Sequence, residues 1–592
     1  MKRLIPFAVA VVLIVIVGVF WLIPEIRKRT SYSTERVDLN EYYQIYSSTE
    51  VPVMLQDELI EERAQLVDGV VYVDQDFVSN HLTDRFYYNE AEGVLLYTTA
   101  TDVIRAGVDD GSTVYYVGEE EISAGYQIAY TKQGKLFIAL DYVKNYANFE
   151  YELFREPNRM QLYTEWGKIT TATVSDDVEV RTLGGIKCPI LTTVPAGSKV
   201  TVLNQMETWT EIKTPDAIKG YVETKYLKNI AEEEQVPVTD FAGIQYPKVT
   251  SDETICLGWH YVGSQSANDN LASLVKNASG MNVISPTWFF VKDNEGTILD
   301  LGSRSYVEKA HQRGLEVWAL VEDITYKGKF DLGVVLGTSE KRAVLIDTLM
   351  DAVNKYGLDG LNIDFEGVSK ESAPHFLQFL RELSIRTHEA GIILSVDNYM
   401  PVHWKRYYKY DEQENRYYER DKKGNPYYKY AEQGIVADYV ILMGYDEHWA
   451  GCEEAGSVAS LPFVQNGISG AICLGVPSEK LINALPFYTR VWETTGGKLK
   501  DTTDSMVNVA LWASARGMEF TWDSELCQNY GRLEKGDTVY EVWMEDTDSI
   551  QAKLNLMLDY HLGGVACWML GYEDPAVWPL LQGYVETNVV GN

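Results

Sequence analysis

One short stretch of the chain places two carboxylates where they could exchange protons with a bound molecule. Residues 358–367 read Leu-Asp-Gly-Leu-Asn-Ile-Asp-Phe-Glu-Gly, and apolar and polar side chains alternate along them. Side chains two residues apart in a β-strand share a face, so Asn362, Asp364 and Glu366 lie together. Repulsion between neighbouring carboxylates raises the pKa of one and lets it keep a proton near neutral pH. The pattern predicts a general acid; the alternative is a structural carboxylate pair held by Arg or Lys.

Such a strand must be held by a larger fold, and the C-terminal region has a regular pattern of strands and helices. Between about residues 250 and 590, strand-like apolar runs alternate with helical periods such as 341–356 and 373–389. Eight β-then-α units in this region predict an α/β fold, a (β/α)8 TIM barrel with insertions. We expect its strands near residues 254–261, 283–290, 316–321, 360–365, 392–396, 439–444, 481–488 and 564–568.

The alternation also predicts how the carboxylate strand sits in the barrel. Leu361, Ile363 and Phe365 face the surrounding helices, and the polar set faces inward at the C-terminal end of the strand. That end of the barrel carries the chemistry in TIM-barrel enzymes. We therefore expect Asp364 and Glu366 in a substrate pocket.

The carboxylate strand resembles the D-x-x-D-x-D-x-E signature of glycoside hydrolase family 18. Here it reads Asp359-x-x-Asn362-x-Asp364-x-Glu366, with Asn at the second acidic position. The same departure occurs in the branch of bacterial spore-cortex and cell-wall N-acetylglucosaminidases.

Three further segments strengthen the resemblance, which covers nearly all of residues 250–585. Residues 439–446 resemble the sixth strand of the family, 485–492 the seventh, and 542–574 its C-terminal block. The S-x-G-G element common in the third strand is absent. This departure puts the subsite architecture in doubt, and with it chitin as the substrate.

The resemblance implies a substrate-assisted, retaining mechanism in which the 2-acetamido oxygen of the substrate attacks its own anomeric carbon. Glu366 is then the general acid, and Asp364 binds the acetamido N–H and tunes Glu366. Tyr445 donates its hydroxyl to the acetamido oxygen, and Asp359 and Asn362 support Asp364 from below. No metal or other cofactor is required. The other expected substrate-binding residues are Trp568 as the apolar floor, Met443, Asp446, Trp543 and Tyr488, with a core role left open for the last two.

The implied substrate is a β-1,4-linked polymer that contains N-acetylglucosamine. Peptidoglycan is preferred over chitin because the N-terminal features described below place the enzyme at a cell wall. Two alternatives remain open: a non-catalytic cell-wall glycan-binding protein on the same barrel, and an envelope scaffold whose N-terminal modules recruit partners.

An insertion at about residues 404–430 is rich in tyrosine and charge. It is interpreted either as a solvated hairpin or as a rim that stacks sugars. Its tyrosines are Tyr407, Tyr408, Tyr410, Tyr417, Tyr418, Tyr427, Tyr428 and Tyr430.

Two modules precede the barrel, after a polar stalk at residues 30–50. Residues 51–165 alternate apolar stretches with Gly and Asp turns. This α+β module resembles the N-terminal module of some copper amine oxidases, without copper ligands, and is interpreted as a spacer or interaction module. Residues 171–230, with VEVRTLGG, TTVPAGSKVTVL, WTEIKT and GYVETKYL, resemble a bacterial SH3-like β-barrel. That resemblance implies binding of cell-wall peptide or glycan, with a structural spacer as the alternative; acidic residues 231–235 form a linker.

The N-terminus predicts a membrane anchor within residues 1–29. Leu4 to Ile23 is an unbroken apolar stretch of 20 residues, about 30 Å of helix and therefore the thickness of a bilayer core. A cleaved signal peptide needs small residues at its cleavage site, where this chain has Phe20-Trp21-Leu22. Basic residues flank both ends and give no orientation, but long domains translocate largely regardless of charge. We expect a single-pass protein with its bulk on the cell-wall side.

Composition excludes some partners. Lys plus Arg number 52 and Asp plus Glu 86, for a formal charge of −34. Nucleic acid is disfavoured because phosphate binding needs a basic face. The six cysteines show neither CxxC nor Cys/His metal spacing, so they are expected to be buried free thiols.

Overall fold

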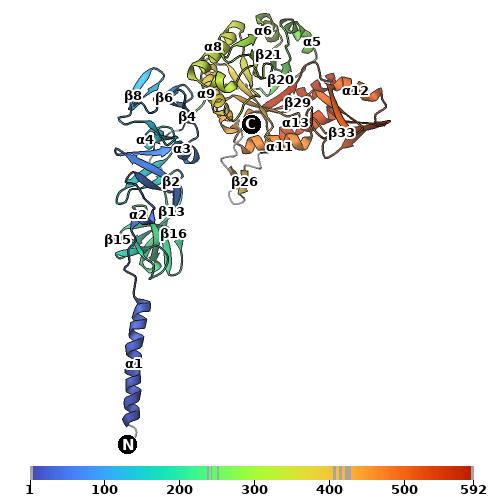
Figure 1. Ribbon diagram of the computed structural model, residues 1–592. Coiled ribbons are helices and arrows are strands. Elements are labelled where there is room, and N and C mark those ends of the chain that lie inside the picture. The colour runs from blue at the N-terminus through green and yellow to red at the C-terminus, as the bar shows by residue number, and fades with distance from the viewer. Residues whose placement is uncertain are drawn as a thin grey trace. The chain divides into compact units, whose positions relative to one another are not determined.

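The computed structural model (Figure 1) describes residues 5–588 except 237, 238, 240, 242, 244, 248, 250–252, 404–407, 412–415 and 420–428. The chain forms two compact units. The first comprises residues 1–86, 106–116 and 120–243, and the second comprises residues 87–105, 117–119 and 244–592.

Eight parallel strands close into a barrel in the second unit, in the order β20-β35-β29-β28-β25-β24-β23-β21, with β20 pairing β21. All eight strands and the (β/α)8 fold expected from the sequence are thereby confirmed. The strands are β20 (Ile255–His260), β21 (Val283–Val291), β23 (Glu316–Glu322), β24 (Gly360–Asp364), β25 (Ile393–Tyr399), β28 (Tyr439–Met443), β29 (Leu481–Pro486) and β35 (Gly564–Trp568).

Two apolar layers hold β24 in place. Leu361, Ile363 and Phe365 are buried against the helices, and the Phe365 ring lies 5.8 Å from those of Phe376 and Phe379 on α9 (Ala373–Glu389). A second apolar cluster fills the barrel interior, with members such as Trp318, Leu320 and Ile441. The polar set of β24 is therefore left facing inward, as the alternation predicts.

Helices follow the strands around the barrel. The 18-residue α8 (Ser339–Tyr356) has Thr338 as N-cap and Gly357 as C-cap, and glycine readily adopts the φ of 75° found there. The others are α5 (Leu271–Leu274), α6 (Arg304–His311), α7 (Leu332–Leu336), α10 (Tyr430–Val436), α11 (Leu461–Cys473), α13 (Thr547–Asp559) and α14 (Trp578–Thr587).

An antiparallel sheet that the sequence pattern does not predict is inserted between β29 and β35. Its five strands run in the order β31-β30-β34-β33-β32, and α12 (Met506–Ser514) packs against it. The strands are β30 (Tyr488–Thr495), β31 (Lys498–Ser505), β32 (Phe520–Asp523), β33 (Gln528–Lys535) and β34 (Thr538–Met544). The seventh barrel strand consequently ends at Pro486, two residues earlier than expected.

The first unit contains two seven-stranded sheets. One has the order β11-β12-β1-β2-β3-β10-β9 and lies within the first expected module. The other has the order β15-β14-β18-β17-β16-β13-β19 and corresponds to the SH3-like domain. Their strands are β1 (Glu50–Leu55), β2 (Glu58–Val67), β3 (Val70–Asp74), β9 (Ala129–Lys132), β10 (Lys135–Ala139), β11 (Glu150–Phe154), β12 (Arg159–Tyr163), β13 (Lys168–Val174), β14 (Val178–Arg181), β15 (Ile190–Val194), β16 (Lys199–Gln205), β17 (Trp209–Lys213), β18 (Lys219–Glu223) and β19 (Leu227–Glu234).

A hairpin within the predicted first module, residues 51–165, belongs to the barrel's unit. Strands β4 (Tyr87–Asn89) and β5 (Val94–Thr98) pair antiparallel. The Tyr87 hydroxyl lies 2.6 Å from Nδ1 of His375, and Nδ2 of Asn89 donates to the Gly337 carbonyl at 2.8 Å. The remaining module boundaries stay predictions.

Three smaller expectations concern the rest of the chain. Helix α1 (Ile5–Thr30) contains a span from Ala10 to Thr30 with an 18-residue window of mean hydropathy 2.2, long and apolar enough to cross a membrane, as a signal sequence also is. All six cysteines are free, with Cys256 and Cys567 buried and the other four partly exposed. In the tyrosine-rich insertion, β26 (Tyr408–Asp411) and β27 (Arg416–Glu419) form a hairpin, whereas Tyr407, Tyr427 and Tyr428 lie outside the described residues.

Candidate active site

A cavity of about 220 Å³ opens at the C-terminal end of the barrel. Asp364, Met443 and Trp568 are the last residues of β24, β28 and β35, and all three reach it. This is the end of the barrel at which the sequence places the chemistry. The full lining is Trp259, Leu320, Asp364, Glu366, Asp397, Tyr399, Met443, Tyr445, Asp446 and Trp568.

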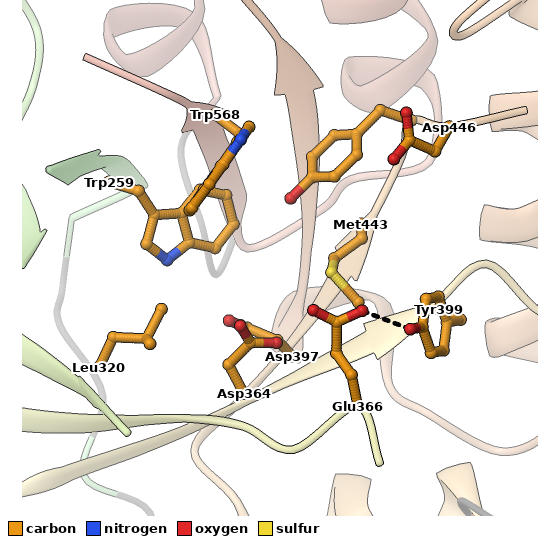
Figure 2. A pocket seen from close by; sticks show the side chains of 10 residues that line it. Trp259, Leu320, Asp364, Glu366, Asp397, Tyr399, Met443, Asp446 and Trp568 are labelled. Atoms are coloured by element: carbon orange, nitrogen blue, oxygen red, sulfur yellow. Dashed lines mark hydrogen bonds between the residues drawn. The ribbon is translucent and has the colours of Figure 1, made fainter. Parts of the chain in front are cut away.

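Glu366 projects into this cavity (Figure 2). Its backbone N–H donates to Oδ1 of Asp323 at 2.9 Å, which fixes the chain directly after β24. The Tyr399 hydroxyl, from the end of β25, donates to Oε2 of Glu366. Glu366 is therefore held by a neutral donor and points toward the open space above it, a position suited to a proton donor.

Asp364, which is partly buried, and Asp397, which is buried, lie side by side between Leu320 and Glu366 (Figure 2). Burial, followed by the charges of neighbouring carboxylates, raises the pKa of both groups well above the ordinary range. Nδ2 of Asn362 donates to Oδ1 of Asp397 at 2.7 Å and partly opposes that rise. The environment of this pair therefore favours a proton on one of the two carboxyls beside Glu366.

Tyr445 supplies a neutral donor on the β28 side of the cavity. Burial raises the pKa of its hydroxyl well above 10, so the hydroxyl keeps its hydrogen at all ordinary pH values. The Tyr445 ring lies 6.0 Å from that of Tyr488, whose hydroxyl donates to Oδ1 of Asp446 at 2.7 Å. Arg490 of β30 also reaches Asp446, at 3.2 Å. The inserted sheet therefore helps to fix the rim of the cavity.

Two tryptophans form an apolar wall. The rings of Trp259 and Trp568 lie 5.9 Å apart at 62°, and Figure 2 shows both on one side of the carboxylates. The peptide bond from Trp568 to Met569 is cis. A flat apolar surface next to polar groups is the arrangement on which sugar rings stack.

The structure brings together six of the ten site residues expected from the sequence: Glu366, Asp364, Tyr445, Trp568, Met443 and Asp446. Asn362 lies beneath them, bonded to Asp397 rather than to Asp364. Tyr488 contacts Asp446 from outside the cavity lining.

Asp359 and Trp543 are placed elsewhere. Oδ2 of Asp359 accepts the Val317 N–H and lies 2.8 Å from Nε2 of His311, at the opposite end of β24. Five residue steps along the strand, roughly 16 Å at 3.3 Å per step, separate it from Asp364, so Asp359 does not support Asp364. Trp543 lies on β34 and packs against Tyr530 at 4.8 Å, away from the cavity lining.

Four lining residues were not foreseen: Asp397, Tyr399, Trp259 and Leu320. Asp397 and Tyr399 are two residues apart at the C-terminal end of β25. They show the same period-two signal as the carboxylates of β24, and that signal could have identified them.

Comparison with known families agrees with this geometry. The model described as glycosyl hydrolases family 18 matches residues 257–573, more than half of the chain. The chain belongs to family 18. A bacterial SH3 domain model matches residues 176–228 and confirms the second module. The family 18 barrel is thus that of a glycosidase, and the copper amine oxidase resemblance stays a prediction.

Several relatives of this family 18 chain are known. An uncharacterized glycosylase, YvbX, from Bacillus subtilis is 25% identical over 54% of this chain and 89% of its own length. A cortical fragment-lytic enzyme from Bacillus anthracis is 24% identical over 49% of this chain, which spans 65% of that protein. The crystal structure of the Bacillus cereus spore cortex-lytic enzyme SleL is 21% identical, with a TM-score of 0.48 over 59% of this chain and 78% of SleL.

Proposed function

We propose that the chain hydrolyses β-1,4 linkages of an N-acetylglucosamine-containing polymer, with peptidoglycan preferred over chitin. The observation that carries the proposal is one cavity in which Glu366, Asp364 and Tyr445 meet beside a tryptophan wall. A relative named as a cortical fragment-lytic enzyme and an SH3 domain support a cell-wall polymer as the substrate. The intact carboxylates argue against a purely glycan-binding role.

The first step of the proposed reaction uses the acid and the substrate's own acetamido group. The acetamido oxygen attacks the anomeric carbon while the bond to the leaving oxygen breaks and Glu366 gives that oxygen its proton. Asp364 accepts the acetamido N–H, and Tyr445 donates to the acetamido oxygen. Trp568 stacks on the distorted sugar.

The second step restores the enzyme. The Glu366 carboxylate takes a proton from a water molecule, whose oxygen attacks the anomeric carbon from the side of the departed group. The bond from that carbon to the acetamido oxygen then breaks. Two displacements at one carbon retain its configuration.

The test is replacement of the acid. We expect Glu366→Gln to keep the melting temperature and to lower hydrolysis by about a hundredfold or more, the scale of general acid catalysis. Mass analysis of fragments from purified peptidoglycan and from chitin oligomers measures the loss and identifies the substrate. The matched control is Glu371→Gln, at an exposed glutamate five residues further on; equal activity of both variants would remove Glu366 from the reaction.

The N-terminal features complete the proposal. Helix α1 acts as a single-pass membrane anchor, and the barrel works on the cell-wall side. The SH3 domain binds wall peptide or glycan and keeps the barrel near its substrate. The apolar span of α1 and the SH3 match support these assignments.

A further inference from the structure

Asp397 is a buried carboxylate in the cavity that the reaction described above leaves without a role. The pairing between β24 and β25 ends at Ile363 and Val396. Asp364 and Asp397 are therefore the next residues along two neighbouring strands, whose backbones run about 4.8 Å apart. Figure 2 shows the two carboxylates adjacent to each other, with Glu366 beside them.

The amide of Asn362 fixes Asp397 in this position. Its Oδ1 accepts hydrogen bonds from Nε1 of Trp259 at 2.9 Å and from Oγ of Ser285 at 3.2 Å. These donors determine which end of the amide carries the nitrogen, so Nδ2 faces Asp397 and donates to it at 2.7 Å. A donor of this kind favours the ionised form of Asp397. Oδ1 of Asp364, in contrast, has no hydrogen-bond partner among the residues that the structure describes.

The surroundings of the pair keep one proton on it. Two adjacent carboxylates largely shielded from water resist being ionised together, because each repels the charge of the other and little solvent stabilises either charge. Three carboxylates lie near the pair: Glu366, Asp323 and Glu322. The other titratable group beside it is the neutral hydroxyl of Tyr445.

We propose that Asp397 is a positioning residue that shares one proton with Asp364 and takes it over during the reaction. The inference rests on the proposed function. In the resting site, the Asp364 hydroxyl donates to the Asp397 carboxylate. When the substrate is bound, the O–H bond of Asp364 breaks and an O–H bond forms on Asp397. Asp364 is then the anion that accepts the acetamido N–H, and the net charge of the pair is unchanged.

The strand pairing explains why Asn362 suffices where the family signature has an acid. A carboxylate on β25 reaches the position beside Asp364 from the neighbouring strand. Asn362 then has the task of orienting that carboxylate. The acid that the signature places on β24 is thus supplied by β25 instead. Asn362 and Asp397 compensate each other.

The test compares Asp397→Asn with a variant that exchanges the two side chains, Asn362→Asp with Asp397→Asn, in the full chain in detergent solution. In Asp397→Asn, Asp364 can release its proton only to solvent. Hydrolysis of peptidoglycan or chitin oligomers at slightly acid pH should fall about tenfold or more with little change in KM. The kcat of this variant should rise with pH where the wild-type kcat is flat. The exchange variant should regain most of the rate and the flat profile, which packing alone does not predict.

Each outcome is decisive. If Glu366→Gln is inactive but Asp397→Asn keeps the wild-type rate and pH profile, the proposed function stands and the role of Asp397 is refuted. An exchange variant no better than Asp397→Asn refutes it equally. If the wild type cleaves no polymer, the proposed function fails. Infrared spectroscopy at neutral pH then tests separately whether Asp364 and Asp397 share a proton. A carboxylic acid band that persists in Glu366→Gln and disappears in Asp364→Asn with Asp397→Asn supports the shared proton; its absence from the wild type excludes it.

Discussion

The Tyr445 hydroxyl offers a test at the scale of single residues. Replacing it by Phe removes a donor aimed at developing charge and should lower kcat about a hundredfold, without changing the melting temperature. Because burial raises the pKa of Tyr445 well above 10, the hydroxyl stays protonated, and the ratio of wild-type to variant kcat should be the same at every pH. Tyr488→Phe is the matched control, since it keeps the ring beside Tyr445 and removes only a hydroxyl that donates to the rim residue Asp446. Equal losses in both variants, or a pH-dependent ratio, would contradict the donor role.

Single residues also show most clearly which parts of the site could be predicted from the sequence. Asp364 and Glu366 could be predicted because two carboxylates in alternation with apolar residues are visible on a single strand. Asp397 shares a strand face with Tyr399 but is the single acidic residue of β25, so its role beside Asp364 becomes visible only through the pairing of β24 with β25. Asp359 was assigned to the site from the signature, although its distance along the strand from Asp364 separates the two.

At the scale of elements, the eight barrel strands could be predicted because parallel strands covered on both faces are nearly continuous apolar runs. The inserted sheet escaped prediction because strands such as β31 are largely exposed and polar. Such a strand lacks the apolar alternation by which strands are recognised.

At the level of secondary-structure elements, we predict that helix α1 stays attached as a membrane anchor. Its 26 residues span about 39 Å, more than a bilayer core, and Phe20-Trp21-Leu22 block a small-residue cleavage site. The membrane fraction should therefore contain the chain at its full mass, as intact mass analysis would show. Phe20→Ala with Leu22→Ala creates an Ala-x-Ala site and should yield a shortened, released product. A shortened wild-type chain in the medium would identify α1 as a signal sequence.

At the scale of the whole molecule, the hairpin β4–β5 ties an early segment of the chain to the barrel's unit. Arg342 is fully buried, pairs with both carboxylate oxygens of Glu382 at 2.9 Å and lies 5.2 Å from the Tyr87 ring centroid. Tyr87→Ala removes this cover from a desolvated ion pair. We expect the unfolding free energy of the barrel's unit to fall by about 3 kcal/mol. Denaturant unfolding measures this change, with the loss of hydrolytic activity reporting the unfolding of that unit.

The control for this prediction is Tyr46→Ala, at a side chain that is 85% exposed, which should change the unfolding free energy by less than about 0.5 kcal/mol. Equal effects of the two substitutions would show that the hairpin contributes nothing to the barrel. The predicted difference would mean that a barrel cut out at residue 250 leaves Arg342 and Glu382 without their cover. Charged groups buried without compensation are costly, so the glycosidase unit should include residues 87–105 to be fully stable.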